Sequence, residues 1–259
     1  MSIAHVQTPI LRVHFLDVGY GDSILIQFPS SKTLLIDAGY PQYSEKIFSY
    51  LSNLSIKKLD GVILTHSHEN HFGGLQGLVG RLPIAQVWIN GDSRSDAGYE
   101  DLLSKFRAKS IAIAILKRGD TLSHFAEKAI FEVFHPSTFS EDINSNSLVI
   151  KFTWSDASFL FTGDISQSAQ DQLAKTEGER LHATVIQIPH HGVPISETFS
   201  KSFKASFYVI STGPSKWLLP DSEELKRLQG TVLRTDTEGS IIFESNGKKL
   251  ERVQGYAGV

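Results

Sequence analysis

The residues that could do chemistry are histidines, and five of the ten in this sequence fall in two tight clusters. The first cluster comprises His66, His68 and His71 and directly follows the apolar segment 61–65, which is predicted to be a buried strand. Imidazole is a common ligand for zinc, iron, nickel and manganese ions. Three imidazoles between a buried strand and a Gly-Gly pair therefore predict a metal site rather than a solvated polar loop.

The second cluster is the pair His190 and His191, again at the end of an apolar strand-like segment. Between the two clusters, the segment 158–164 is a predicted strand that ends in Asp164. Loops at strand ends often build functional sites. Neutral nitrogens that hold two ions, with a shared carboxylate between them, are the donor set of a two-metal hydrolytic site, in which a bound water ionises near neutral pH.

Composition excludes several other chemistries. The 259 residues include no cysteine, so a thiolate metal site, a cysteine nucleophile and a disulfide framework are all ruled out. The balance of 25 basic against 28 acidic residues argues against a broad basic surface for nucleic acid or membranes. The longest apolar runs are of strand length and the N-terminus does not read as a signal peptide. We expect a cytoplasmic protein with no membrane contact.

The elements that must position these residues follow from the hydrophobic pattern. Strands are expected over 11–18, 22–28 and 32–38, separated by short turns, which indicates an antiparallel meander. Helices are expected over 42–54 and 99–108. The second half repeats this alternation, and no linker or low-complexity tract divides the chain. One domain over residues 1–259, with two packed sheets and helices outside, is therefore the favoured architecture.

Seven segments in order resemble a known family: FLDVGYGDSILI, TLLIDAG, HSHENH, NSNSLVI, FTGD, PHHG and RTDTEG. The chain resembles the metallo-β-lactamase-fold hydrolases, and in particular the soluble hydrolase domain of ComEC/Rec2-type DNA-uptake proteins and its free-standing relatives. The resemblance covers residues 11–245, which is nearly the whole chain. It implies an α+β fold, a four-layer αββα sandwich, with metals in a groove where the two sheets meet.

The resemblance also implies a role for each site residue. One or two divalent ions, most simply zinc or manganese, would be held by His66, His68, His71, Asp164 and His191. Asp164 would bridge the ions, and the choice between His190 and His191 as the last ligand stays open, with His191 favoured. His190, Asn144 and Asn146 would contact the substrate or steady its developing negative charge. Asp37 would be a structural residue beneath the site.

The chain departs from the family pattern at one charged position. The family motif reads His-x-His-x-Asp-His, and this chain has Asn70 where the aspartate binds the second metal and orients the attacking water. An amide can coordinate a metal but carries no charge and takes up no proton. Asp164 is then the only assured carboxylate, since Glu69 should point away. We expect a weak or empty second metal site and a mononuclear or slow enzyme.

The chain departs from the family pattern at two further places near the expected site. Val193-Pro194 replaces the family's usual serine, and segment 216–220 lacks the usual glycine-histidine-proline loop, which makes the expected site wall more apolar. Segment 19–22 joins two predicted strands and is interpreted as a hairpin turn. The other histidines, including His135 and His14, are interpreted as core or surface residues.

The sequence thus favours a metal-dependent hydrolase that uses a metal-bound hydroxide on a phosphodiester-type substrate. A small phosphodiester or a short single-stranded nucleic acid is expected, because duplex binding relies on many Lys or Arg contacts. Asn70, His190 and Asn146 are the expected catalytic contacts. Two alternatives remain at this stage: an inactive binding protein with the same fold, motivated by Asn70, and a lactone, thioester or β-lactam hydrolase, motivated by the apolar segment 217–219.

Overall fold

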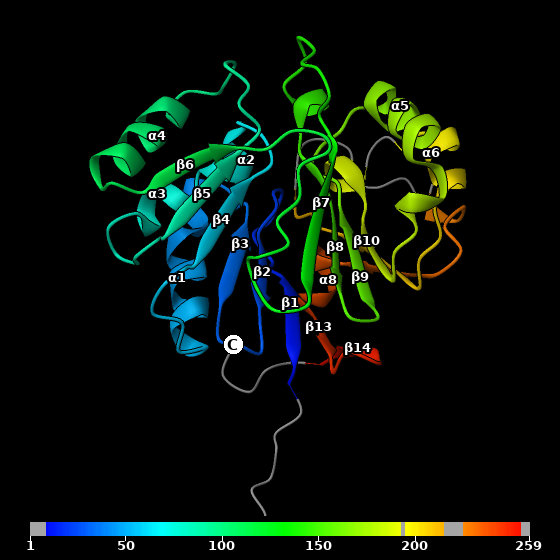
Figure 1. Ribbon diagram of the computed structural model, residues 1–259, viewed down its shortest axis with the longest axis horizontal. Coiled ribbons are helices and arrows are strands. Elements are labelled where there is room, and N and C mark those ends of the chain that lie inside the picture. Colours follow the sequence, from blue (N-terminus) through cyan, green and yellow to red (C-terminus); the bar gives the residue numbers. More distant parts are fainter. Residues whose placement is uncertain (1–8, 193–194, 215–224, 255–259) are drawn as a thin grey trace, which may run out of the picture.

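The computed structural model describes residues 9–192, 195–214 and 225–254. Two β-sheets pack face to face, and helices cover the outer face of each sheet (Figure 1). The predicted four-layer αββα sandwich is therefore confirmed. The 217–219 segment and the Val193-Pro194 pair lie outside the described residues.

The first sheet has the strand order β14-β13-β1-β2-β3-β4-β5-β6. Its strands are β1 (Leu11–Phe15), β2 (Ile24–Gln27), β3 (Thr33–Ile36), β4 (Gly61–Leu64), β5 (Gln86–Ile89), β6 (Ala112–Ile115), β13 (Ile241–Ser245) and β14 (Leu250–Val253). Strands β1, β2 and β3 pair in antiparallel fashion, which confirms the predicted meander, and β3 to β6 pair in parallel.

The second sheet has the order β12-β11-β10-β9-β8-β7. Its strands are β7 (Ala129–His135), β8 (Val149–Trp154), β9 (Ala157–Phe161), β10 (Val185–Gln187), β11 (Phe207–Ile210) and β12 (Thr231–Arg234). Strands β7 to β9 are antiparallel, and β9 to β12 are parallel. Each sheet therefore contains a parallel part whose strands all end at one edge.

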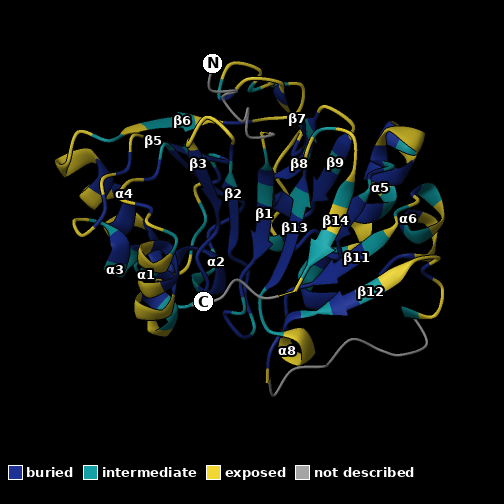
Figure 2. Ribbon diagram, turned by 90° about the horizontal axis from the view of Figure 1, so that it is seen from below, coloured by how far each residue is buried: buried dark blue, intermediate teal, exposed yellow. Residues whose placement is uncertain are grey.

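The helices bury one face against the sheets and expose the other (Figure 2). The first sheet is covered by α1 (Ser44–Asn53), α3 (Leu75–Leu78) and α4 (Tyr99–Ala108), and the second by α5 (Gln167–Glu177) and α6 (Glu197–Ser202). Two short helices, α2 (Glu69–Phe72) and α8 (Thr235–Glu238), follow strands β4 and β12. The predicted helices 42–54 and 99–108 correspond to α1 and α4, because their apolar residues recur at helical spacing.

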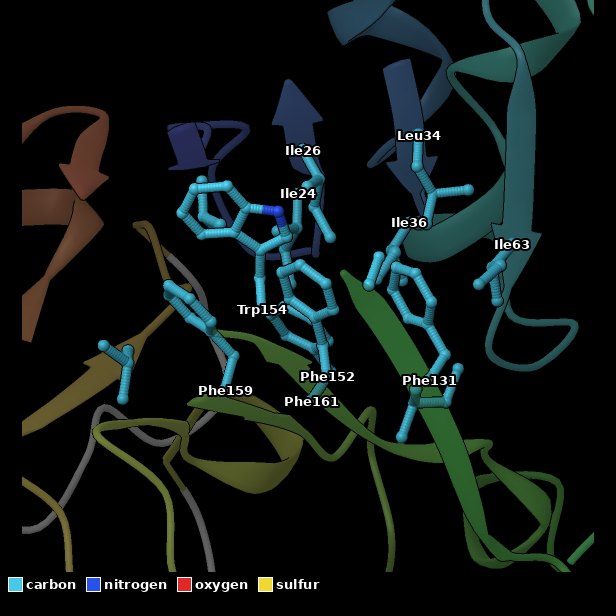
Figure 3. Packing of buried hydrophobic residues seen from close by; sticks show 14 of the residues in the cluster. Ile24, Ile26, Leu34, Ile36, Ile63, Phe131, Phe152, Trp154, Phe159 and Phe161 are labelled. Atoms are coloured by element: carbon cyan, nitrogen blue, oxygen red, sulfur yellow. The ribbon is translucent and has the colours of Figure 1, made fainter. Parts of the chain in front are cut away.

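An aromatic cluster fills the space between the two sheets (Figure 3). Phe131 and Phe152 stack with their ring centroids 4.5 Å apart, and Phe159 and Phe161 continue the row. These rings face aliphatic side chains of β2, β3 and β4. Full burial of one such side chain contributes about 1.5–3 kcal/mol. The shared core is consistent with one domain, which stays a prediction.

Strand direction decides which loops meet. Because β3 and β4 are parallel, as are β9 and β10, their carboxyl ends lie at one edge of each sheet. Strand β2 runs antiparallel to β3, with Ile24 opposite Ile36, so the start of β2 lies beside the end of β3. Among the described residues, none of the helices has the length and hydropathy of a bilayer-spanning segment.

His14 of β1 provides a test of this packing. Its ring is fully buried, where Nε2 donates to Gln27 Oε1 at 2.8 Å and Nδ1 accepts from the Tyr50 hydroxyl at 2.9 Å. Burial lowers the pKa of His14 to about 4 from 6.5. Between these two values the unfolded chain takes up a proton that the folded chain does not, so the free energy of unfolding falls as the pH falls.

We therefore expect the unfolding free energy of the wild type to lose about 2 kcal/mol more than that of His14→Gln between about pH 7 and about pH 5. Urea denaturation of both proteins at both pH values measures the difference. The same pH dependence in both proteins would show that His14 is not the responsible group.

Candidate metal centre

The carboxyl ends of strands from both sheets bring the predicted site residues together. His66 follows β4, Asp164 follows β9 and His191 follows β10, while His71 lies in α2. All four are at most 2% exposed. Together with His68, these residues are called the cluster below. The buried strand ends and short loops that the sequence predicted thus converge on one place.

Asp164 is the hub of the cluster. Its Oδ2 atom lies 3.0 Å from His71 Nε2, 3.3 Å from His191 Nε2 and 3.9 Å from His66 Nε2. Its Oδ1 atom is buried and has no hydrogen-bond partner. Atoms that bind one zinc ion at about 2.1 Å lie about 3.0–3.5 Å apart, which is close to the spacings around Oδ2. The donor set, with two of its three spacings in this range, therefore fits a divalent metal that Asp164, His71, His191 and His66 would hold.

Asp37 orients His71 from beneath. Its carboxylate accepts hydrogen bonds from the Thr65 backbone N–H at 2.9 Å and the Thr65 hydroxyl at 2.6 Å. The same carboxylate accepts the Nδ1–H of His71 at 2.8 Å, which directs Nε2 of that ring at Asp164. A carboxylate behind a ligating histidine is a frequent support of metal sites, because it fixes the ring and raises its basicity.

The other two buried rings are fixed in the same sense. His66 Nδ1 lies 3.1 Å from the Thr65 hydroxyl and 3.2 Å from the Ser147 hydroxyl. Both hydroxyls donate their own protons elsewhere, so they accept from His66 Nδ1–H. His191 Nδ1 donates to the Ser211 carbonyl at 2.8 Å. The neutral forms of these rings therefore present Nε2 lone pairs to the cluster, as metal coordination requires.

His68 and Asn70 complete the set from the first motif. His68 is half-buried, and its Nδ1 lies 3.1 Å from His66 Nε2, so both nitrogens can reach one ion. The Asn70 amide lies 3.0 Å from His191 Nε2, which places position 70 beside a predicted metal ligand. His191 lies next to Asp164, whereas His190 is half-buried, so His191 stays the favoured ligand.

Burial and neighbouring charges shift the pKa values in the cluster. Burial acts to lower the pKa of His71, but Asp164 and Asp37 outweigh it and raise that pKa well above 6.5. Burial and the charge of His71 lower the pKa of His66 well below 6.5. Although burial opposes it, the charges of His191 and His71 hold the pKa of Asp164 well below its usual value. The positive charge of the imidazoles thus compensates the buried negative charge of Asp164, as a bound metal ion would.

The contacts of Asn146 do not support the catalytic role expected from the sequence. The Oδ1 atom of Asn146 accepts from the Ser140 backbone N–H at 2.8 Å, and its amide donates to the Ser140 carbonyl and to Asp92. Its side chain therefore holds the loop that contains residues 140–146. A motif cannot reveal this, because it does not show where an amide finds its hydrogen bonds. His190 is half-buried and has a positive φ, as has His191.

Sequence reasoning missed Asp22, which it placed in a hairpin turn. Asp22 is 1% exposed, and its Oδ2 atom accepts from the Gln187 amide. Asp22, Asp164 and His191 each offer one ligand atom, and these atoms lie within 4.8 Å of one another. The sequence thus did not reveal a second buried carboxylate close to Asp164 and His191. The available signal was the predicted meander, because the start of β2 must lie beside the end of β3.

A family model described as the metallo-beta-lactamase superfamily matches residues 16–196. The match spans more than half of the chain, so this protein belongs to the metallo-beta-lactamase superfamily, whose members are mostly metal-dependent hydrolases that bind divalent metals. The fold and the resemblance predicted from the sequence are confirmed.

Individual relatives agree with this assignment. The chain is 28% identical to ComE operon protein 3 of Bacillus subtilis (strain 168), over 90% of this chain and 33% of that protein. It therefore spans about a third of the length of that curated relative. Among solved structures, YhfI from Bacillus subtilis superposes with a TM-score of 0.60 at 14% identity, over 92% of this chain and 100% of the other. A diphosphatase from the PhnP family superposes with a TM-score of 0.52 at 15% identity, over 91% and 98%.

Replacing Asp37 by asparagine tests its support of His71. Asparagine tolerates the positive φ of 57° at this position, so the backbone should be kept. We expect zinc affinity to fall about 10- to 100-fold, because the ring loses its charged partner. Competition with a chromophoric chelator measures the affinity. Asp101→Asn, an exposed carboxylate of α4, is the matched control, and equal affinities in both variants would contradict this role.

Proposed function

We propose that this chain is a metal-dependent hydrolase of phosphodiester-type substrates. The observation that carries the proposal is the convergence of three buried imidazole Nε2 atoms on Asp164 Oδ2, at the edge where loops of both sheets meet. Each ring is held by a hydrogen bond on its other nitrogen. Such a prearranged donor set is costly to keep buried and serves metal binding.

Zinc or manganese, one or two ions per chain, is the proposed cofactor. His66 and His68 would hold one ion, His71 and His191 the other, and Asp164 would lie between them. When bound, a divalent ion lowers the pKa of a coordinated water and polarises the phosphoryl oxygen of a substrate. The protein supplies nitrogen ligands in fixed positions, and the burial of the cluster keeps bulk water from competing with them for the ion.

Residues at the rim would meet the substrate. His190 is half-buried beside His191, and burial lowers its pKa, so a neutral ring can donate one hydrogen bond to a phosphoryl oxygen. The Asn70 amide is the second candidate donor, next to His191. A net charge of −3 favours a small phosphodiester or a short single strand over duplex DNA. The structurally similar PhnP-family protein is named a diphosphatase, and an enzyme that acts on phosphoryl groups is compatible with a phosphodiester substrate for this chain.

A second candidate function is binding without catalysis. It is favoured by Asn70, whose amide donates to His191 Nε2 and cannot take up a proton. The lactone, thioester or β-lactam alternative depended on segment 217–219, which lies outside the described residues. The retained cluster favours the hydrolase.

Turnover of a bis-aryl phosphodiester, with manganese or zinc added, tests the proposal. We expect hydrolysis by the wild type and a loss of at least about 100-fold in kcat/KM in Asp164→Asn, because the bridging charge is removed. Asp101→Asn should keep the full rate. Bound metal without turnover under either ion would contradict a phosphodiesterase and favour the binding protein.

A further inference from the structure

We propose that Asp22 is the second carboxylate of the metal centre and that, with Asp164 and His191, it holds the second ion in place of the aspartate that position 70 lacks. This inference rests on the metal centre of the proposed function. It replaces the expectation of a weak or empty second site with that of a complete one whose charge comes from a different loop.

The first support is a pair of unused oxygen atoms. Oδ1 of Asp22 and Oδ1 of Asp164 are both buried and have no hydrogen-bond partner. Buried polar atoms are nearly always paired, so an orphan that recurs on two neighbouring carboxylates calls for a ligand. The two carboxylates and His191 offer atoms within 4.8 Å of one another and so form a group that could hold a metal ion.

The second support is the way in which Asp22 is held. Its Oδ2 atom accepts from the Gln187 amide, and Gln187 Oε1 in turn accepts from the Thr162 backbone N–H at 3.2 Å. These contacts tie Asp22 to the loops after β10 and β9, which carry His191 and Asp164. A turn residue with only a local role would not need an anchor in the opposite sheet.

Asp22 also lies directly against position 70. Its backbone N–H donates to the Asn70 carbonyl at 3.3 Å, and its carbonyl accepts from the Gly39 N–H at 2.8 Å. A Cβ atom on Gly21 would meet the Asn70 carbonyl oxygen at 2.4 Å, so the two loops approach as closely as only glycine allows. A carboxylate at position 22 can therefore serve the ion that a carboxylate at position 70 would serve.

Orientation of His71 does not explain Asp22. The Asp22 carboxylate lies 3.8 Å from His71 Nδ1, which is too long for a hydrogen bond, and that nitrogen already donates to Asp37. Asp37 is less suited to supply the missing charge than Asp22, because both of its oxygens already accept hydrogen bonds from Thr65 and His71, whereas Oδ1 of Asp22 accepts none. Two carboxylates, Asp22 and Asp164, would then offset the charge of the two divalent ions, and the family pattern provides the same number of carboxylates.

Metal content of four proteins tests the inference: wild type, Asp22→Asn, Asn70→Asp and the double variant. Each is dialysed against zinc or manganese, and elemental analysis gives the ions per chain. We expect two ions in the wild type. Asp22→Asn should keep one ion and bind the second about 100-fold more weakly. The double variant should regain two ions, because Asn70→Asp returns the carboxylate to the neighbouring loop.

Asp17→Asn is the matched control, since Asp17 precedes the same turn but pairs with Lys46 at the surface. It should hold two ions with wild-type affinity. Thermal melting with and without metal gives a second readout, since an ion that binds only the folded chain raises Tm. Far-ultraviolet circular dichroism and the retained first ion show that Asp22→Asn is folded.

Two results would overturn the inference: a wild type that holds one ion or none, or an Asp22→Asn variant that binds two ions as tightly as the wild type. A wild type that holds one ion, or an Asp22→Asn variant that binds two, is compatible with continued phosphodiester hydrolysis, which leaves the proposed function standing; a wild type that holds no ion contradicts both. Conversely, the wild type could bind two ions and Asp22→Asn one, as expected, while the wild type shows no phosphodiester turnover. That result would contradict the proposed substrate class and support the role of Asp22.

Discussion

The rest of the site depends on one buried charge, the carboxylate of Asp164. A carboxylate in the protein interior is costly unless positive groups and hydrogen bonds compensate it. Three imidazoles surround one of its oxygens, and each imidazole is fixed from behind, by Asp37, by Thr65 with Ser147, or by the Ser211 carbonyl. The protein thus prepares nitrogen lone pairs around a negative centre, an arrangement that suits a divalent cation better than any neutral ligand.

The two sheets make this arrangement possible because each ends in parallel strands at the same edge. The stacked rings of Phe131 and Phe152 and their neighbours hold the sheets face to face, so the loops after β4 and β9 approach one another. Only short loops separate the strands from the ligands. The imidazoles are therefore held in place by the rigid sheets.

Much of this was predictable from the sequence, for physical reasons. The apolar segments followed by His66 and Asp164 predicted both the strands and the ligands, because strand ends and metal donors are visible as patterns of neighbouring residues. Asp22 left none, since its importance comes from the pairing of β2 with β3 and from an anchor 165 positions away on Gln187. The opposite error arose at Asn146, where a motif suggested a substrate contact and the amide instead holds its own loop.

The origin of the ligands in both sheets has a consequence for how the folded chain is held together. His71 lies in α2, which follows strand β4 of the first sheet, and Asp164 follows strand β9 of the second sheet, 93 positions later in the chain. An ion that joins them would close a long loop, as a disulfide does, and would remove entropy from the unfolded chain. In a protein without a single cysteine, such an ion would act as a cross-link that thiol reductants leave intact and chelators remove.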